Sequence, residues 1–223
     1  MKMIKPITRG IRKLLMSSQE KRHALVGPAK EWQMKRDFQQ NFVMNQGLKP
    51  QHRFVDIGCG TLRGGIPIIE YLETGHYFGL DVREEVFVEA RKELANYGLE
   101  AKKPVLTASD NFDTLRFEER FDMIFAFSVL IHMADEIAGA CLKFVGLHLT
   151  EDGAFYANVN LGDRPDAEWQ GFPIVFRTVE FYQQLAKAGG LQVETLATIG
   201  ELGHQSKYKL GNQQLMLKFT KAK

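Results

Sequence analysis

The feature of this sequence that most limits its possible folds is a regular alternation of short apolar runs and helical stretches, which begins near Arg53. The runs are rich in Val, Ile and Phe, as buried strands are. They cover residues 54–57, 77–80, 105–108, 123–127 and 154–159. Stretches with helical patterns lie among them, at 64–73, 84–97 and 135–149. Such an alternation predicts a parallel sheet with helices on both faces.

The last part of the chain has a different pattern. A helix is predicted over 178–188, and two strands follow over 192–199 and 214–219 with only a loop between them. Strands that are joined without a crossover helix should run antiparallel. We therefore predict an α/β fold with a doubly wound, mostly parallel seven-stranded sheet, an antiparallel last strand and a basic N-terminal helical extension.

The chain has 223 residues, which is enough for one domain with a full core, and Gly27-Pro28 divides it. We expect a basic N-terminal arm over 1–26 and one domain over 27–223. In that domain, residues 27–48 should form a lid helix and residues 50–219 the core sheet.

The arm holds seven Lys or Arg residues and one acidic residue, Glu20. Three interpretations are open: a solvated or dimer-contacting arm, an amphipathic helix with weak contact to a membrane surface, and a transit peptide. Residues 27–223 hold the other 22 basic and 26 acidic residues. This acidic domain is a poor match for a nucleic-acid backbone, so no nucleic-acid partner is expected.

The cysteines and histidines give no metal-site pattern. Cys59 and Cys141 are too few for a disulfide framework or a multi-cysteine zinc site, and the histidines form no pair at metal-ligand spacing. The longest apolar run, 123–133, is shorter than the roughly 20 residues that cross a bilayer. We expect a metal-free protein of the reducing cytoplasm.

A glycine turn follows the first predicted strand, in the stretch Val55–Gly65. Gly58 and Gly60 allow positive φ and a close approach of the backbone to a ligand. Asp56 would repel a pyrophosphate, and the dinucleotide pattern G-x-G-x-x-G would need glycine where Arg63 stands. The turn therefore argues against NAD and FAD.

Two further acidic residues follow the second and third predicted strands. Asp81 lies about 20 residues after the turn, the spacing at which a carboxylate binds ribose hydroxyls. It could instead cap the helix that begins near Glu84. Asp110 could bind an adenine amino group or begin a turn.

With these motifs in order, the sequence resembles the class I S-adenosylmethionine-dependent methyltransferases. The resemblance rests on Asp56-x-Gly58-x-Gly60, on Asp81 and on Asp110 after successive strands. It extends to the stretch 121–132, which looks like the fourth strand of the family and the turn after it. It covers residues 50–219 and implies a Rossmann-like methyltransferase with S-adenosyl-L-methionine as cofactor and S-adenosyl-L-homocysteine as product.

The resemblance also implies roles for single residues. In the methionine half of the cofactor site, Gly58 and Gly60 would lie against the methionine part and Asp56 would anchor its amino end. Phe127 and Ser128 would lie under the same tail.

In the nucleoside half, the resemblance implies that Asp81 binds the ribose hydroxyls and that Val82 lies against the adenine. Asp110 would meet the adenine amino group, with Asn111 and Phe112 beside the ring.

Two positions within the turn need comment. Leu62 stands where many members of the family have a third glycine, which narrows the turn. Cys59 lies at a place where the family often has cysteine, and we interpret it as a small packed residue of the cofactor site rather than a nucleophile.

The acceptor should bind at the carboxyl ends of the strands, where ligands of open parallel sheets lie. We predict an acceptor pocket formed by residues from the lid helix and from the loops after the later strands. These residues are Trp32, Asn160, Arg164, Trp169 and Tyr208.

Transfer to oxygen or nitrogen requires a base, and His132, in the turn after the fourth strand, is the first candidate, with His204 the second. We predict methyl transfer to an oxygen or nitrogen of a small-molecule acceptor. The alternatives are a module that binds the cofactor without transferase activity, and a methyltransferase for a lipid-linked or glycan acceptor.

Overall fold

The computed structural model describes residues 22, 24–169 and 171–222. Most of the predicted N-terminal extension therefore lies outside the described residues, and only Arg22 and the short 3-10 helix η1 (Ala24–Val26) can be placed. No helix in the described part of the chain has the length and apolar character needed to cross a membrane. Among the same residues, no three His, Cys, Asp or Glu side chains gather where they could share a metal ion.

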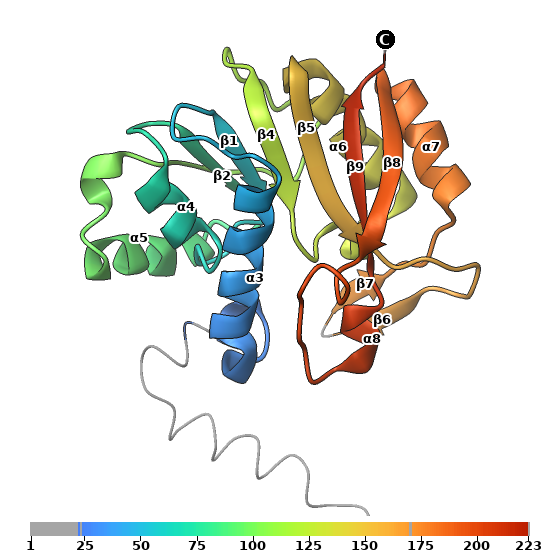
Figure 1. The fold of residues 1–223 in the computed structure, drawn as a ribbon, viewed down its shortest axis with the longest axis horizontal. Coiled ribbons are helices and arrows are strands. Elements are labelled where there is room, and N and C mark those ends of the chain that lie inside the picture. Colours follow the sequence, from blue (N-terminus) through green and yellow to red (C-terminus); the bar gives the residue numbers. More distant parts are fainter. Residues whose placement is uncertain (1–21, 23, 170, 223) are drawn as a thin grey trace, which may run out of the picture.

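A seven-stranded sheet forms the centre of the structure, in the order β3-β2-β1-β4-β5-β9-β8 (Figure 1). The pairs from β3 to β5 are parallel, whereas β9 is antiparallel to both β5 and β8. The strands are β1 (Phe54–Ile57), β2 (Tyr77–Asp81), β3 (Val105–Ala108), β4 (Phe121–Ala126), β5 (Leu149–Val159), β8 (Leu191–Thr198) and β9 (Leu215–Lys221). The predicted α/β fold with an antiparallel last strand is thus confirmed.

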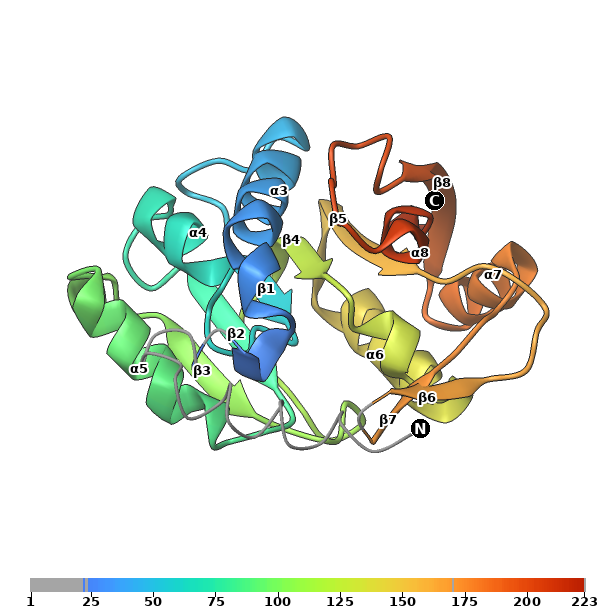
Figure 2. The same cartoon turned by 90° about the horizontal axis from the view of Figure 1, so that it is seen from below.

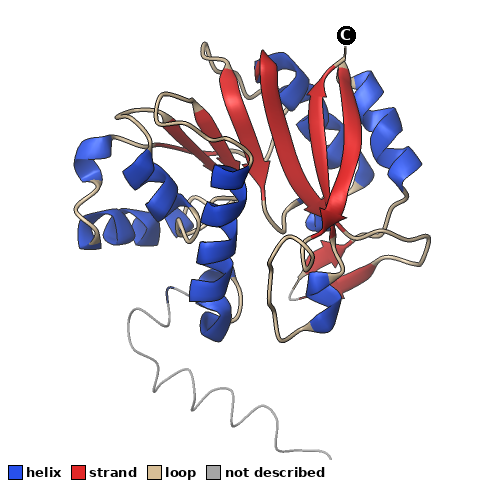
Figure 3. Ribbon diagram, viewed as in Figure 1, coloured by secondary structure: helices blue, strands red, loops and turns tan. Residues whose placement is uncertain are grey.

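Helices cover both faces of this sheet (Figure 3). One apolar cluster joins it to the helices on the first face, and a second cluster joins it to the helices on the other. The first face carries α3 (Trp32–Asn45), α4 (Gly65–Tyr71) and α5 (Val86–Asn96), and the second carries α6 (Asp135–His148) and α7 (Val179–Ala188).

The alternation of side chains along β1 shows why both faces must be covered. Phe54 belongs to the first cluster, whereas Val55 and Ile57 belong to the second, and all are buried. A strand whose successive side chains are all apolar or buried cannot leave either face to water. Asp56, on the same face as Phe54, is the exception, and its environment is described below.

Two small elements were absent from the sequence prediction. Strands β6 (Ala167–Trp169) and β7 (Phe172–Ile174) form a short antiparallel hairpin, and the short helix α8 (Lys209–Asn212) lies in the loop between β8 and β9. In Figure 1 the hairpin and α8 lie below the edge at which β4 and β5 end. Figure 2 looks at the molecule from that side, with η1 and the start of α3 opposite the loop that carries α8.

The predicted lid helix corresponds to α3, which begins after the 3-10 turn η2 (Ala29–Glu31). Phe38, Phe42 and Val43 of α3 are buried in the first cluster. The second half of the helix is therefore packed against the sheet, and its first turns reach past the carboxyl edge (Figure 1).

Candidate active site

The turn after β1 brings two glycines to the carboxyl edge of the sheet. Gly58 and Gly60 have φ of 74° and 54°, values that glycine adopts without strain. The backbone N–H groups of Gly58 and Cys59 donate to the carbonyl of Leu80, at 2.7 and 2.9 Å. The turn is thereby fixed against the end of β2.

Two valines cover these glycines. A Cβ atom at Gly60 would lie 2.5 Å from Cγ1 of Val26, and one at Gly58 would collide with Val129. The absence of side chains therefore allows the segment with Val26 to lie directly on the turn.

Asp81 is buried at the end of β2 and holds the turn in place. Its Oδ2 accepts a hydrogen bond from the N–H of Gly60 at 2.9 Å, and its Oδ1 accepts from the N–H and Nε of Arg83, at 3.0 and 3.1 Å. A carboxylate has about four acceptor positions, so Asp81 can accept a further donor such as a hydroxyl. Helix α5 has Glu85, not Asp81, at its N-cap, so Asp81 is not the cap of that helix.

The other residues predicted for the nucleoside half lie on open loops. Val82 is 58% exposed, and Asp110 and Asn111 are exposed after β3. Phe112 is half-buried, with its ring 5.6 Å from that of Phe144. Their roles beside an adenine stay predictions.

Asp56 points into the protein rather than toward the open edge. It is buried, and its Oδ2 accepts a hydrogen bond of 2.7 Å from the Tyr77 hydroxyl. Burial raises the pKa of Asp56 to about 7, while the Tyr77 hydrogen bond and the charge of Arg63 act in the opposite direction. Its predicted contact with the amino end of the cofactor stays a prediction.

Arg63 lies between the glycine turn and α4, and the sequence interpretation used it only as a departure from the dinucleotide pattern. Its Nη1 donates to the carbonyl of Val26 at 2.7 Å, but its Nε is buried without a hydrogen-bond partner. Burial lowers its pKa to about 10, against the attraction of Asp56 and Glu31. The sequence signal that could have identified Arg63 as a site residue is a basic side chain directly after the glycine turn and just before α4.

Cys59 is buried within the turn, and burial raises the pKa of its thiol well above the ordinary range. A thiol that stays protonated is a poor nucleophile. This environment agrees with the interpretation of Cys59 as a packing residue.

The segment after β4 connects the glycine turn with β5, α3 and the loop after β8. Ser128 has a φ of 59°, and its N–H donates to Oδ1 of Asn158 at 2.7 Å. Phe127 is buried, and its ring lies 5.3 Å from that of Phe38 and 5.6 Å from that of His204. These three rings join β4, α3 and the loop after β8.

The position of the proton on His204 follows from its neighbours. Asn212 donates through Nδ2 to the carbonyl of Ser206 and accepts through Oδ1 from the N–H of Ser206. Because Oδ1 of Asn212 is also 2.8 Å from Nδ1 of His204, Nδ1 must carry the proton. Nε2 then carries a lone pair, and it is buried without a hydrogen-bond partner.

His132 lies in the 3-10 turn η4 (Leu130–His132), against the β6–β7 hairpin. Its Nδ1 is 2.7 Å from the carbonyl of Pro173, and its ring lies 5.9 Å from that of Phe172. Burial lowers the pKa of both His132 and His204, so both favour the neutral form. Each could serve as a base, but only the His204 ring contacts Phe127 and Phe38.

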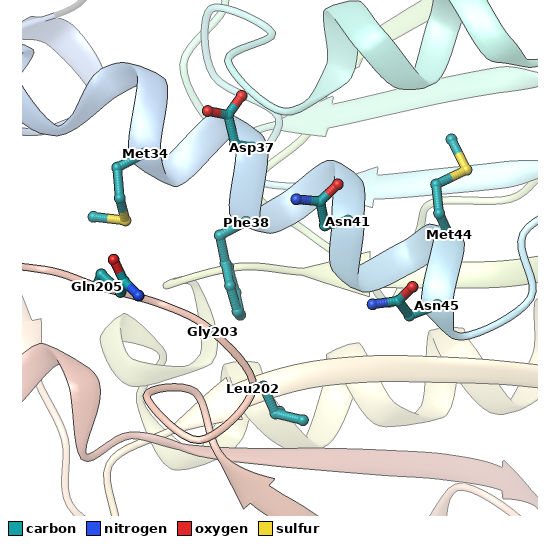
Figure 4. Close-up of a pocket in the computed structure, with 9 residues that line it drawn as sticks. All are labelled: Met34, Asp37, Phe38, Asn41, Met44, Asn45, Leu202, Gly203 and Gln205. Carbon is teal, nitrogen blue, oxygen red and sulfur yellow. The ribbon is translucent and has the colours of Figure 1, made fainter.

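A groove runs between α3 and the loop over 202–205 (Figure 4), and we call it the α3 groove. Its volume of about 640 Å³ is in the range of small-molecule sites. The residues that line it are Met34, Asp37, Phe38, Asn41, Met44, Asn45, Leu202, Gly203 and Gln205.

Four of the five residues predicted for an acceptor pocket, namely Trp32, Asn160, Arg164 and Tyr208, do not line the α3 groove. Trp32 is buried, and Asn160 is bonded to Val175 and Gln214. Arg164 is exposed and lies over the ring of Phe176, and Tyr208 is 62% exposed. Trp169 belongs to β6, at the edge of the described residues. Their role in an acceptor pocket stays a prediction.

Comparison with known proteins identifies the domain. A family model described as a methyltransferase domain matches residues 55–155, which include the glycine turn, Asp81 and the segment after β4. No curated protein sequence matches the chain.

Solved structures share the fold over nearly the whole chain. Magnesium protoporphyrin IX methyltransferase from Synechocystis, with bound S-adenosylmethionine, has 14% identity and a TM-score of 0.65, with 100% of both chains covered. An S-adenosylmethionine-dependent methyltransferase from Clostridium acetobutylicum has 14% identity and a TM-score of 0.64, with 97% of both chains covered. The glycopeptide N-methyltransferase MtfA has 12% identity and a TM-score of 0.63, with 84% of this chain and 94% of that chain covered.

The fold and the matched domain agree with the motifs read from the sequence. The fold is thus that of the S-adenosylmethionine-dependent, class I Rossmann-like methyltransferases, and the part of the chain over residues 55–155 matches a methyltransferase domain.

Proposed function

We propose that the protein transfers a methyl group from S-adenosylmethionine to an oxygen or nitrogen atom of a small-molecule acceptor that binds in the α3 groove. The observation that supports this most directly is that Phe38 contacts both the α3 groove and the segment predicted to bind the cofactor. Its side chain lines the groove, and its ring packs on Phe127, in the segment predicted to lie under the methionine tail.

The residues present fit the cofactor. Within the described residues, the buried side-chain atoms without a hydrogen-bond partner are Thr61 Oγ1, Arg63 Nε and His204 Nε2. Thr61 and Arg63 follow the glycine turn directly, where a ligand that carries a carboxylate, an amino group and hydroxyls would meet them. Unpaired buried polar atoms are rare in proteins, so their position at the turn favours a polar ligand there.

The chain's own contribution would be to bind the cofactor and to orient the acceptor toward its methyl group. Asp81 would hold hydroxyl groups of the nucleoside, and the glycine turn would hold the tail. When bound, the cofactor supplies a methyl group on a sulfonium, which is already a good leaving group. Holding an acceptor atom in line with such a group can contribute up to roughly 7–11 kcal/mol to catalysis.

His204, whose ring lies 5.1 Å from that of the groove residue Phe38, would remove the proton of the acceptor. Its Nδ1 proton is held by Asn212, which leaves the Nε2 lone pair as the acceptor of a proton. Its lowered pKa keeps the ring neutral at physiological pH, as a general base requires. His132, the first candidate from the sequence, becomes the second in this proposal, although its Nδ1 likewise lies 2.7 Å from an acceptor, the carbonyl of Pro173.

The groove lining indicates the chemical class of the acceptor. Three amides (Asn41, Asn45 and Gln205) and the carboxylate of Asp37 supply polar contacts, and methionines with Phe38 and Leu202 supply apolar ones. No Lys or Arg is found in the lining among the described residues. We therefore expect a neutral or cationic acceptor with hydrogen-bonding groups, rather than an acidic one.

The experiment is a multiple-turnover assay that measures S-adenosylhomocysteine release with phenols, amines, carboxylic acids, sugars and a lipid-linked glycan as separate acceptors. Turnover with phenols, amines or sugars, reduced in a Phe38→Ala variant, would support the proposal. Turnover with carboxylic acids or the lipid-linked glycan alone would contradict it. Binding of S-adenosylhomocysteine without turnover of any acceptor would favour a module that only binds the cofactor.

A further inference from the structure

We propose that Arg63 and Lys35 form a partly buried subsite for a carboxylate, and that its ligand is the carboxylate of the cofactor's methionine tail. The inference rests on S-adenosylmethionine as the cofactor. It assigns a function to two residues that the sequence motifs leave unexplained.

The first observation is that Arg63, which is partly buried, has no ion pair in the described part of the chain. Within the described residues, no carboxylate oxygen lies within 4.0 Å of the Arg63 guanidinium nitrogens. Its Nη1 donates to a backbone carbonyl, and its Nε is buried without a partner. Asp56 and Glu31 attract this cation only from beyond ion-pair distance, and a partly buried charge without a direct ion pair is costly, so this position favours the binding of an anion.

The second observation is a second cation, on the helix that packs against the residues after Arg63. Lys35 lies one helical turn before Gln39, whose Oε1 would be 2.6 Å from a Cβ atom at Gly64, so α3 packs directly on the residues after Arg63. The side chain of Lys35 is only 18% exposed, and its Nζ is 4.0 Å from Oε2 of Glu31. Burial and the charge of Arg63 lower the pKa of Lys35 to about 8.

Glu31 does not neutralise both cations. Its carboxylate accepts hydrogen bonds from the Ser206 hydroxyl at 2.8 and 3.0 Å and from the N–H of Lys207 at 3.0 Å. These bonds commit Glu31 to fastening η2 to the loop after β8. Two partly buried cations, of which only Lys35 has an ion pair with Glu31 among the described residues, favour an anion that binds between α3 and the turn.

The position of Arg63 at the glycine turn indicates which anion would bind. Arg63 is three residues after Gly60, at the turn predicted to hold the methionine part of the cofactor. That part carries the cofactor's carboxylate. A planar guanidinium binds a carboxylate with well-defined geometry, and Lys35 would add a second charge.

The test is titration calorimetry with two ligands, S-adenosylhomocysteine and its decarboxylated analogue, which keeps the nucleoside, the sulfur and the amino group. The proteins are wild type, Arg63→Gln, Arg63→Lys and Lys35→Met. Lys30→Met is the control, because Lys30 is an exposed cation in the same segment. Thermal unfolding of each variant shows whether the fold is retained.

We expect Arg63→Gln to weaken S-adenosylhomocysteine binding by about tenfold or more, because a charge-assisted contact is lost. Binding of the decarboxylated analogue should change by less than about threefold. Lys35→Met should show a smaller loss in the same direction, Arg63→Lys should recover part of the affinity, and Lys30→Met should match wild type.

Equal losses for both ligands would overturn the proposal, since Arg63 would then act by holding the Val26 segment. Unchanged affinities for both ligands would overturn it as well. If wild type bound neither ligand, the cofactor assignment itself would fail, and this is a different result from a loss confined to the variants.

Discussion

The carboxylate of Asp81 accepts a hydrogen bond of 2.9 Å from the backbone N–H of Gly60, so the end of β2 and the glycine turn after β1 are held by one side chain. The same carboxylate binds Arg83, whose Nη1 donates to the carbonyl of Leu25 at 3.3 Å. Asp81 is thus connected to the turn directly and to η1 through Arg83.

Replacement of Asp81 by Ala should weaken S-adenosylhomocysteine binding by about tenfold or more, because the acceptor for the ribose hydroxyls is lost. It should also lower stability by about 1–3 kcal/mol, because the Gly60 N–H loses its partner. Calorimetry and thermal unfolding measure the two effects. Asp152→Ala, at an exposed carboxylate at the start of β5, is the control, and normal affinity in Asp81→Ala would refute the ribose assignment.

Gly60→Ala should destabilise the protein by about 1–3 kcal/mol, since the new Cβ would be strained at φ 54° and would lie 2.5 Å from Val26. The double variant with Val26→Ala should recover part of this loss, which a double-mutant cycle of unfolding free energies detects. Gly75→Ala is matched for positive φ (80°) but has no atom within 4 Å of its Cβ position. Equal losses at Gly60 and Gly75, without rescue, would mean that Val26 does not lie on the turn.

His204 should contribute to stability in a pH-dependent way. Burial lowers its pKa below 6.5, and the charges of Lys35 and Arg63 add to this effect while Asn212 and Glu31 oppose it. The unfolded chain therefore takes up the proton more readily, so the contribution is complete above pH 6.5 and is lost as the pH falls.

His204→Gln should consequently show a smaller drop in melting temperature than wild type between about pH 7.5 and about pH 5. His52→Gln replaces a histidine outside the site and serves as the control. If the His204→Gln and wild-type curves stay parallel, the histidine is not held in its neutral form.

The contribution of Asp56 to stability should change with pH in the opposite direction to that of His204. Burial raises its pKa from 3.8 to about 7, so its contribution is complete below pH 3.8 and is lost as the pH rises through about 7. Asp56→Asn keeps an acceptor for the Tyr77 hydroxyl but cannot ionise. The Asp56→Asn variant should therefore lose less stability than wild type between about pH 5 and about pH 8.5, as measured by denaturant titrations. An identical loss in both proteins would contradict a buried, uncharged Asp56.

Most of the fold could be predicted because periodicity and burial agree along the chain. The run 54–57 became β1 with the same bounds, since each of its side chains is buried. The β6–β7 hairpin was missed because its three-residue strands are mostly exposed and give no period-2 pattern. Helix α8 has four residues, too few for a helical repeat to appear in the sequence.

The candidate site was predictable only where it lies in a contiguous motif. Gly58, Gly60 and Asp81 follow strands at known spacings, and the structure joins Gly60 and Asp81 by a hydrogen bond. The subsite of Lys35 and Arg63 depends on how α3 packs on the turn, which no local pattern encodes. The predicted acceptor residues were chosen from the lid helix and from loops after the later strands, and such a choice does not show which side chains line the α3 groove.

The position of β9 has a consequence for the order of folding. β8 joins the sheet only through β9, which pairs with β5 on its other side. During synthesis the half of the sheet that carries the glycine turn can therefore assemble first, whereas β8 must wait until residues 215–221 have left the ribosome. The loop that carries His204 gains its fixed position in the same late step, so a chain stopped before β9 would keep the turn's strands and lack one wall of the α3 groove.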